Sequence, residues 1–432
     1  MTARDAEAAF REMWRELAPL GRHPASGGYR RYAWTRADAD CRAWFRGQAE
    51  ARGLVHETDR NGNQWAWLGD PLAGDAVVTG SHLDSVPDGG AFDGPLGVVS
   101  AFAALDELRR RGAEFTRPLG IVNFGDEEGA RFGLACTGSR LAAGRLTREQ
   151  AHLLTDAAGV TLPRAMEAAG YDPDAIGPDP GRLGRIGAFV ELHVEQGRSL
   201  DRTGDPLGIA SAIWPHGRWR YDFRGEANHA GTTLLADRRD PMLPYAETVL
   251  AARREAELAG ALATFGKVAV EPNGVNAVPS LVRGWLDSRA ADAATLDALT
   301  AAVERAARDH AERAGVALDV VRDSFTPVVE FRHTLRDELA RILGDRVPGD
   351  GVPGDGVPGD RTGDRRHPVP VPVLATGAGH DAGILSASVP TAMLFVRNPT
   401  GVSHSPAEHA TEQDCVAGVA ALADVLEGLA CR

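Results

Sequence analysis

Two patterns of apolar residues alternate along the chain: short continuous runs, and longer stretches with an apolar residue at every third or fourth position. Short runs predict buried strands, and the longer spacing predicts amphipathic helices. The main helices are expected over 6–18, 37–52 and 98–111. Strands are expected over 54–58, 64–68, 76–78, 118–124, 189–193, 370–374 and 392–396, the first two joined by the hairpin turn Arg60-Asn61-Gly62-Asn63. This alternation of strands and helices predicts an α/β fold with a mainly parallel sheet.

The pattern changes near Pro215. Strands are expected over 218–224, 265–271, 281–287 and 317–322, and helices over 242–259 and 293–313. The resulting order, β-α-β-β-α-β, is that of a ferredoxin-like α+β domain. A chain of 432 residues is long enough for two domains. We therefore expect a small inserted domain at 214–325, with 1–213 and 326–432 forming the two parts of the larger domain.

Polar clusters follow four of the strands expected in the larger domain. His82 and Asp93 follow the first of these strands, a Glu127-Glu128 pair follows the second, and the other two lead to His193 and His404. Carboxyl ends of parallel strands lie along one edge of a sheet, so these side chains should meet there. Histidine and carboxylate ligands suit divalent metal ions, and this set can hold two ions about 3.5–4 Å apart. For residues 79–97 alone, a structural turn with an N-capping aspartate is the alternative.

Two further features refine the expected site. Asp84 lies two residues after His82 and can hold that imidazole by a hydrogen bond from behind. Of Glu127 and Glu128, one can bind metal while the other takes a proton from the attacking water. Because adjacent carboxylates raise each other's pKa, such a pair suits general-base chemistry.

Composition narrows the possible partners and location. A net charge of −13 argues against nucleic acid or an anionic membrane as a partner. The four cysteines are widely spaced, the N-terminus lacks the features of a signal peptide, and no apolar run is long enough to span a bilayer. We therefore expect a cytoplasmic protein with reduced thiols. The repeat at 347–360 is expected to be an exposed, poorly ordered loop without a catalytic role.

The motifs resemble the M20 family of metallopeptidases and amidohydrolases, and within it the branch of N-carbamoyl-L-amino-acid hydrolases, allantoate amidohydrolases and β-ureidopropionases. The matching motifs extend over nearly the whole chain. They are Gly80-Ser-His-Leu-Asp-Ser, Gly90-Ala-Phe-Asp-Gly, Glu127-Glu-Gly-Ala-Arg-Phe, Thr137-Gly-Ser-Arg140, His193-Val-Glu-Gln-Gly197, Asn228-His-Ala-Gly-Thr-Thr233, Asn276-Ala-Val-Pro, Asp287-Ser-Arg289, Gly379-His-Asp-Ala382 and Ser403-His-Ser-Pro.

The resemblance implies a role for each matching residue. It implies one metal ion bound by His82, Asp93 and His193, a second bound by Asp93, Glu128 and His404, and Glu127 as general base and later proton donor. Residues implied to act on the substrate are Arg289 for its carboxylate, His229 and Asn276 for the oxyanion, Gln196 for the ureido end, and Gly377 and His380 as pocket lining. The small domain is implied to be a lid that pairs two chains into a homodimer.

The implied function is that of a di-metal amidohydrolase. It would cleave the carbamoyl C–N bond of a small ureido acid and release ammonia and carbon dioxide, using zinc, manganese, cobalt or nickel. An aminoacylase or dipeptidase of the same fold is the first alternative. A non-catalytic metal-binding protein is the second, and the presence of Glu127 argues against it. Two observations leave the substrate open: the motifs fit both allantoate and N-carbamoyl amino acids, and Leu234-Leu235 stands where the relatives usually have Pro-Met.

Overall fold

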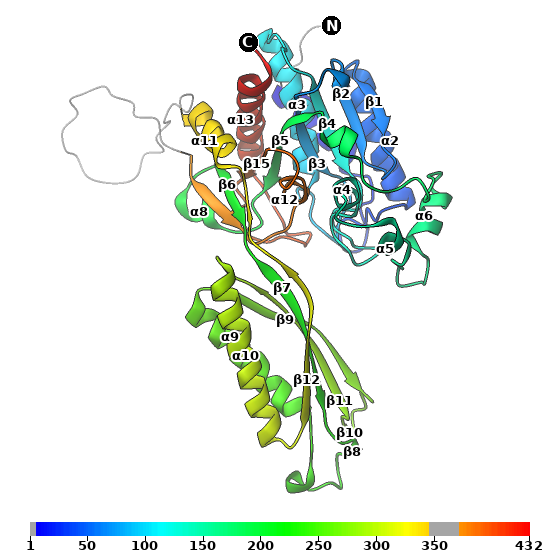
Figure 1. Cartoon of the computed structure of the whole chain (residues 1–432), viewed down its shortest axis with the longest axis vertical. Helices are drawn as coiled ribbons and strands as arrows, with labels where there is room; N and C mark the ends of the chain where they lie inside the picture. The colour runs from blue at the N-terminus through cyan, green and yellow to red at the C-terminus, as the bar shows by residue number, and fades with distance from the viewer. Residues whose placement is uncertain (1–5, 345–370) are drawn as a thin grey trace, which may run out of the picture. The chain divides into compact units, whose positions relative to one another are not determined.

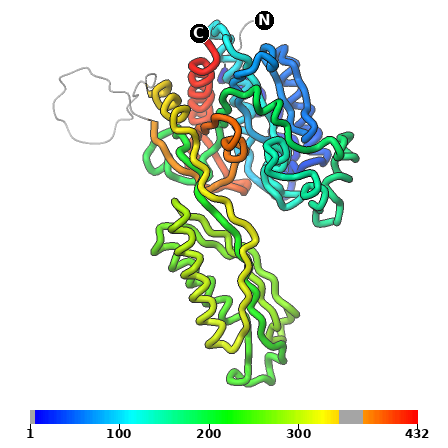
Figure 2. The backbone as a smooth tube through the Cα atoms, viewed as in Figure 1, coloured from blue at the N-terminus to red at the C-terminus, as the bar shows by residue number. Residues whose placement is uncertain are grey.

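A computed structural model describes residues 6–344 and 371–432 of the chain (Figure 1). The described residues divide into two compact units. The smaller unit comprises Ala212–Glu330 with Ala375–Ala378, and the larger unit comprises the rest. Figure 2 shows that the larger unit is built from both the beginning and the end of the chain. The domain boundaries expected at 214 and 325 stay predictions, and the 347–360 repeat lies outside the described residues.

The main sheet has the order β1-β2-β4-β3-β5-β15-β6-β13, and β14 also pairs with β6. Its strands are β1 (Val55–Thr58), β2 (Gln64–Leu68), β3 (Ala76–His82), β4 (Leu119–Phe124), β5 (Ile186–Val194), β6 (Leu207–Ile213), β13 (Val329–Glu330), β14 (Val373–Thr376) and β15 (Thr391–Val396). The neighbours β4, β3, β5 and β15 are parallel, whereas β1, β2, β6 and β13 pair antiparallel. The sheet is therefore mixed, and the expectation of a mainly parallel sheet describes only its centre. A short turn joins β1 to β2, and such hairpins are necessarily antiparallel.

Helices cover the parallel centre of the sheet. The long ones are α1 (Ala6–Leu17), α2 (Arg36–Ala51), α3 (Pro95–Arg111), α11 (His333–Gly344) and α13 (Glu412–Ala430). Helix α3 packs against β3, α1 and α13, and residues 95–108 are all buried. It ends at Gly112, which has a left-handed backbone (φ 72°) that glycine adopts without strain. Because α3 starts just after Asp93, its burial fixes the position of that loop.

Short helices occupy the region between β4 and β6, together with one near β15. They are α4 (Thr137–Ala142), α5 (Arg148–His152), α6 (Leu162–Ala168), α7 (Pro180–Leu183), α8 (Ser199–Thr203) and α12 (Asp381–Leu385). Helix α5 begins with a capping box formed by Thr147 and Gln150, and at the start of α6 the Thr161 hydroxyl accepts the N–H of Arg164.

The smaller unit has the expected β-α-β-β-α-β order. Its main elements are β7 (His216–Arg224), α9 (Met242–Ala259), β9 (Leu262–Glu271), β11 (Leu281–Arg289), α10 (Ala293–Arg313) and β12 (Ala317–Thr326). The antiparallel sheet has the order β12-β7-β11-β9, and alternate side chains such as Tyr221, Phe223 and Leu286 form a core with the helices. A separate pair, β8 (Asn228–His229) and β10 (Ala277–Val278), forms a small two-stranded sheet.

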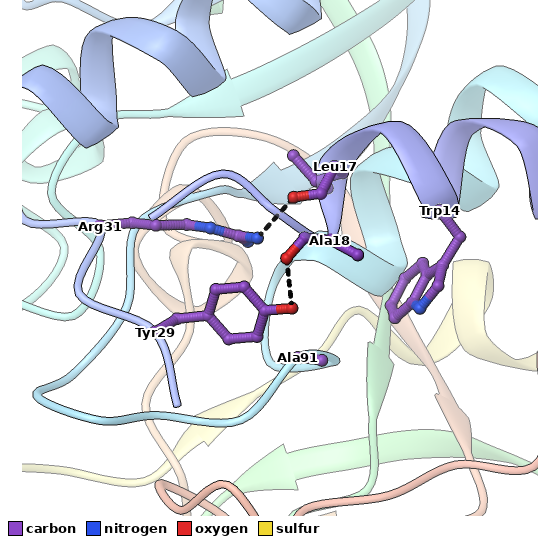
Figure 3. Close-up of a pocket in the computed structure, with 6 residues that line it drawn as sticks. All are labelled: Trp14, Leu17, Ala18, Tyr29, Arg31 and Ala91. Carbon is purple, nitrogen blue, oxygen red and sulfur yellow. Dashed lines mark hydrogen bonds between the residues drawn. The ribbon is translucent and has the colours of Figure 1, made fainter. Parts of the chain in front are cut away.

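A strap before α2 supports the loop that follows β3. The backbone N–H of Tyr29 donates to Gly89 O, and that of Arg31 donates to Ser85 Oγ at 3.0 Å. Figure 3 shows the small pocket under this strap, where the Arg31 guanidinium donates to the Leu17 carbonyl oxygen at the end of α1. The Tyr29 hydroxyl likewise donates to the Ala18 carbonyl oxygen at 2.9 Å, so these two side chains hold the strap against the end of α1.

The four cysteines are free, and three of them, Cys41, Cys136 and Cys415, are buried. Within 6–344 and 371–432, no helix has both the length and the apolar character needed to cross a membrane.

Candidate metal centre and catalytic site

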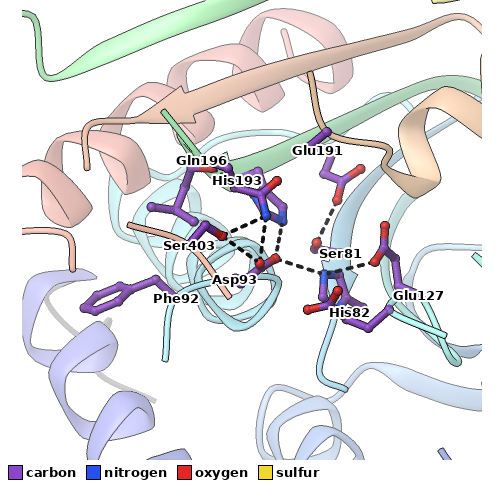
Figure 4. A network of polar contacts seen from close by, with 12 residues as sticks. Ser81, His82, Phe92, Asp93, Glu127, Glu191, His193, Gln196 and Ser403 are labelled. Carbon is purple, nitrogen blue, oxygen red and sulfur yellow. Dashed lines mark hydrogen bonds and ion pairs between the residues drawn. The ribbon is translucent and has the colours of Figure 1, made fainter. Parts of the chain in front are cut away.

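The candidate metal-binding and catalytic residues lie at the carboxyl ends of the four parallel strands β4, β3, β5 and β15 (Figure 4). His82 is the last residue of β3, and His193 is the penultimate residue of β5. Glu127 and Glu128 lie in the loop after β4, and His404 lies in the loop after β15. Adjacent parallel strands thus bring together side chains that are far apart in the sequence.

Asp93 lies between two groups of candidate ligands. Its Oδ1 is 3.6 Å from His82 Nε2 and 3.2 Å from His193 Nε2. Its Oδ2 is 3.3 Å from His404 Nε2, which is itself 3.6 Å from Glu128 Oε2. Each oxygen of the buried Asp93 carboxylate therefore faces a different pair of residues, and each pair together with Asp93 is compact enough for a metal ion. This is the arrangement of a carboxylate that bridges two cations.

The imidazoles are oriented for metal binding. His82 Nδ1 lies 3.2 Å from Asp84 O, and His193 Nδ1 lies 2.9 Å from Val194 O, so these nitrogens act as donors to carbonyl oxygens. A neutral imidazole that donates through Nδ1 has its lone pair on Nε2. Both Nε2 atoms are buried without a hydrogen-bond partner and face Asp93. Lone pairs directed at a carboxylate are favourable when a cation lies between them, so the residues fit a metal centre.

Close packing also holds His82 in place. The backbone of Gly94 has φ 81°, and an added Cβ there would lie 2.4 Å from the His82 ring. Glycine is therefore required on both steric and conformational grounds.

Asp84 anchors the loop that carries the two glutamates. The backbone N–H groups of Glu127 and Glu128 donate to its Oδ1 and Oδ2, at 3.1 and 3.0 Å. Its Oδ1 also lies 3.4 Å from His82 Nδ1. Asp84 thus contacts His82 and also holds the glutamate loop, a contact that the sequence did not reveal.

Glu127 occupies a buried position beside the two candidate metal-binding groups. Its Oε2 is 3.8 Å from His82 Nε2, and its Oε1 accepts a hydrogen bond from the thiol of Cys136 at 3.4 Å. Burial raises the pKa of Glu127 well above its ordinary value, and the nearby carboxylates of Asp381 and Glu128 raise it further against the opposing effect of His82. Burial, followed by Asp93, raises the pKa of Glu128 to about 8. Desolvation is thus the main cause of the raised pKa values, and carboxylate pairing is a smaller one.

Gln196 points its amide at Asp93. Its Nε2 donates to Asp93 Oδ2 at 2.8 Å and to Ser403 Oγ at 3.0 Å. An amide nitrogen has two protons, so these bonds use both and leave His404 Nε2, at 3.3 Å, with its lone pair free. The buried Oε1 has no hydrogen-bond partner. Gln196 therefore presents an unused acceptor.

Four candidate substrate residues lie in the smaller unit: His229, Asn276, Arg289 and Gly377. His229 and Asn276 are both exposed near the β8–β10 pair. The backbone N–H of Ala230 donates to Asn276 O at 2.9 Å. His229 Nδ1 accepts from the N–H of Gly231 at 3.0 Å, so its neutral ring has the proton on Nε2, as an oxyanion donor needs.

Arg289 is already engaged by neighbours within the smaller unit. It donates through Nε and Nη2 to Asp287, at 2.8 and 3.2 Å, and through Nη1 to Gly377 O. Of its five N–H groups, one on each terminal nitrogen remains for a ligand.

His380 is buried next to His193, with ring centroids 4.5 Å apart. Its Nε2 has no hydrogen-bond partner, and burial, with the adjacent His193, lowers its pKa well below the ordinary value. Glu191, which accepts from Ser81 Oγ at 2.7 Å, completes a third group with His193 and His380. His193 cannot serve this group and the Asp93 group at once, because its Nδ1 is used by a carbonyl oxygen.

Sequence reasoning missed Glu408 and Cys136. Glu408 is buried and accepts hydrogen bonds from the N–H groups of Phe92 and Asp93. The only sequence signal for it was its position shortly after the Ser403-His404 motif, and no spacing rule connects it to Asp93. Cys136 lies in the glutamate loop, where nothing in the sequence separates it from an ordinary buried cysteine.

Histidines and carboxylates grouped around a shared buried aspartate, with a further buried glutamate beside them, define a metallohydrolase-type site. His82 and His193 are buried, whereas His404 is exposed. The model of peptidase family M20/M25/M40 matches residues 78–428. The chain belongs to this family. Hydrolases of the family generally use divalent metal ions, and the chain is a hydrolase acting on C–N bonds.

Relatives and solved structures agree with this assignment. The chain is 34% identical to an N-carbamoyl-L-amino acid amidohydrolase of Geobacillus stearothermophilus, over 94% of each chain. It is 31% identical to an allantoate amidohydrolase of Escherichia coli (strain K12), over 96% of each chain. A hydantoinase/carbamoylase family amidase from Burkholderia vietnamiensis has a similar structure, with a TM-score of 0.83, 29% identity and coverage of 99% of this chain and 98% of that one.

Proposed function

We propose that this protein hydrolyses the carbamoyl C–N bond of a small ureido acid, such as an N-carbamoyl-L-amino acid or allantoate. The products would be an amine and carbamate, which breaks down to ammonia and carbon dioxide. The observation that carries the proposal is the position of Asp93 between two groups of metal-type ligands, with Glu127 buried beside them. The names of the relatives favour a ureido substrate over a peptide.

The proposed cation-binding residues are His82, Asp93 and His193 for one ion and Asp93, Glu128 and His404 for the other. Zinc, manganese, cobalt and nickel all suit these ligands. When bound, two such cations would polarise the carbamoyl oxygen and lower the pKa of the attacking water.

Glu127 moves the proton in the proposed reaction. Its Oε2 would take a proton from water and return it to the leaving nitrogen. The raised pKa of Glu127 suits this role, since a carboxylate with a higher pKa is a stronger proton acceptor. A scaffold protein has no use for this buried acid, which argues against a non-catalytic role.

The remaining candidate residues orient the substrate. Gln196 Oε1 would accept a hydrogen bond from the terminal NH₂ of the ureido group, because it is the free atom of that amide. The remaining N–H groups of Arg289 would bind the substrate carboxylate. His229 Nε2 and Asn276 would donate to the developing oxyanion. His380 and Gly377 are proposed to line the pocket.

We also propose a homodimer formed through the smaller unit, in which His229 and Asn276 of one chain complete the site of the other. The sheet of this unit has two edge strands, β12 and β9, and an unpaired edge is a site for association. Two-fold pairing would create two equivalent sites.

The decisive experiment is product analysis on metal-reconstituted protein. N-carbamoyl amino acids, allantoate, N-acetyl amino acids and dipeptides are compared, and ammonia is measured. Chelator-treated protein serves as the control and should be inactive until Mn²⁺, Co²⁺, Ni²⁺ or Zn²⁺ is added. Turnover of acetyl or peptide substrates alone would establish an aminoacylase or dipeptidase instead, and full activity of verified metal-free protein would refute the metal assignment.

A further inference from the structure

A carboxylate outside the proposed ligand set joins two distant loops of the site. Glu408 Oε1 accepts the backbone N–H groups of Phe92 and Asp93, at 3.0 and 2.9 Å. Its Oε2 accepts a hydrogen bond from Ser403 Oγ at 3.0 Å. Phe92 and Asp93 precede α3, whereas Ser403 precedes the candidate ligand His404. One side chain therefore fixes ligand-bearing segments from both ends of the chain.

The fit around Glu408 is tight. Only 4% of the residue is exposed. An added Cβ on Gly90 would lie 2.4 Å from Glu408 Oε1 and 2.5 Å from its Cβ, so the loop before Asp93 passes directly over this side chain. Neither loop can shift without breaking a buried hydrogen bond, and a buried donor or acceptor left unpaired is unfavourable.

Ser403 links Glu408 to Gln196 through a chain of hydrogen bonds. The single Ser403 proton can go to Glu408 at 3.0 Å or to Asp93 Oδ2 at 3.3 Å, and the shorter contact is with Glu408. Ser403 Oγ then accepts one amide proton of Gln196, and the other goes to Asp93. The opposite amide orientation would place Gln196 Oε1 against the Asp93 carboxylate, where it has no donor.

We propose that Glu408 is a positioning residue that holds Asp93 between the two cation groups and, through Ser403, fixes the Gln196 amide with Oε1 free. The role of Gln196 in this inference rests on the proposed function, because it assumes a ureido substrate. The effect of Glu408 on Asp93 should appear in cation binding alone, and it can be tested without a substrate.

The test is titration of Co²⁺ into metal-depleted full-length protein, by calorimetry and by the visible absorption of the bound ion. Glu408→Ala removes the acceptor of two N–H groups and should weaken Co²⁺ binding about 10- to 100-fold, the usual range for residues that support metal ligands. Glu408→Gln keeps an oxygen for both N–H groups and should bind within about threefold of wild type. Wild-type Co²⁺ affinity in Glu408→Gln would show that residue 408 acts by accepting the two N–H groups and that its negative charge is not needed.

Glu195→Ala is the matched control. Glu195 is also a buried glutamate that accepts two backbone N–H groups, from Ser199 and Leu200, but it supports α8. This variant should lose a similar amount of stability while keeping its Co²⁺ affinity. If Glu408→Ala does not fold, Glu408→Asp, too short to reach both loops, replaces it.

Three outcomes would overturn the proposal: wild-type Co²⁺ affinity in the folded Glu408→Ala or Glu408→Asp protein, failure of Gln to rescue, or an equal loss of affinity in Glu195→Ala. Failure of the proposed function gives a different result. The Co²⁺ affinities would then follow the expected order while no ureido acid is hydrolysed.

Discussion

Replacement of Asp84 by Asn is the sharpest test of how the glutamate loop is held. The carboxylate accepts one N–H from Glu127 and one from Glu128, each on a separate oxygen. An Asn amide keeps one acceptor oxygen and places an NH₂ group at the other, so one buried N–H loses its partner. The contact of His82 Nδ1 with the backbone oxygen of residue 84 does not depend on the side chain.

The expected magnitude follows from that single loss. A hydrogen bond to a charged group contributes about 1.5–3 kcal/mol, so the metal-free variant should be less stable by about this amount. Because Glu128 is a proposed ligand, its displacement should also weaken cation binding by about 10- to 100-fold. Urea unfolding of metal-free protein measures the first effect, and Co²⁺ titration measures the second.

Glu195→Gln is the control for this experiment, since the two oxygens of Glu195 also accept one N–H each. It should be destabilised to a similar extent and keep its cation affinity. Wild-type cation affinity in Asp84→Asn protein would refute the argument that Asp84 positions the glutamate loop.

Three other predictions concern the base, the assembly and the effect of pH. Glu127→Gln should lower kcat at least about 10²-fold while Co²⁺ still binds, and normal turnover would show that Glu127 is not the base. Mixing inactive Glu127→Gln and His229→Ala proteins under subunit exchange should restore part of the activity, whereas a monomer in light scattering, or an inactive verified mixed dimer, would exclude a shared site. The hydrogen bonds from Arg283, at 2.6 and 2.8 Å, hold the pKa of Asp222 below its ordinary value. The stability difference between wild type and Asp222→Asn should therefore be complete above about pH 4 and shrink as the pH falls further; a pH-independent difference in Tm would contradict this.

Local patterns predicted the elements where local forces dominate. The β1–β2 hairpin forms around the Asn61-Gly62 turn, and α3 ends at Gly112, as the residue types indicated. The order of elements in the smaller unit also follows the predicted order, because its strands and helices have clear and separate periodicities.

Other features depend on contacts that no local pattern reveals. The antiparallel pairing of β6 with β15 is one of the pairings that make the sheet mixed, and it depends on where the chain returns after β5. Helix α3 is buried almost all round because α1 and α13 cover its outer side, although the sequence indicated only one apolar face.

For the site, the sequence by itself determined which histidines and carboxylates follow the central strands, because these residues stand at or shortly after the ends of apolar runs that form parallel strands. Only the tertiary structure decided that Asp93 Oδ1 faces His193 while Oδ2 faces His404. It also decided that Glu408, 315 residues from Asp93, accepts the N–H of that residue. The physical reason is that hydrogen-bond geometry depends on distances in space, and distances between remote segments are set by the packing of the whole unit.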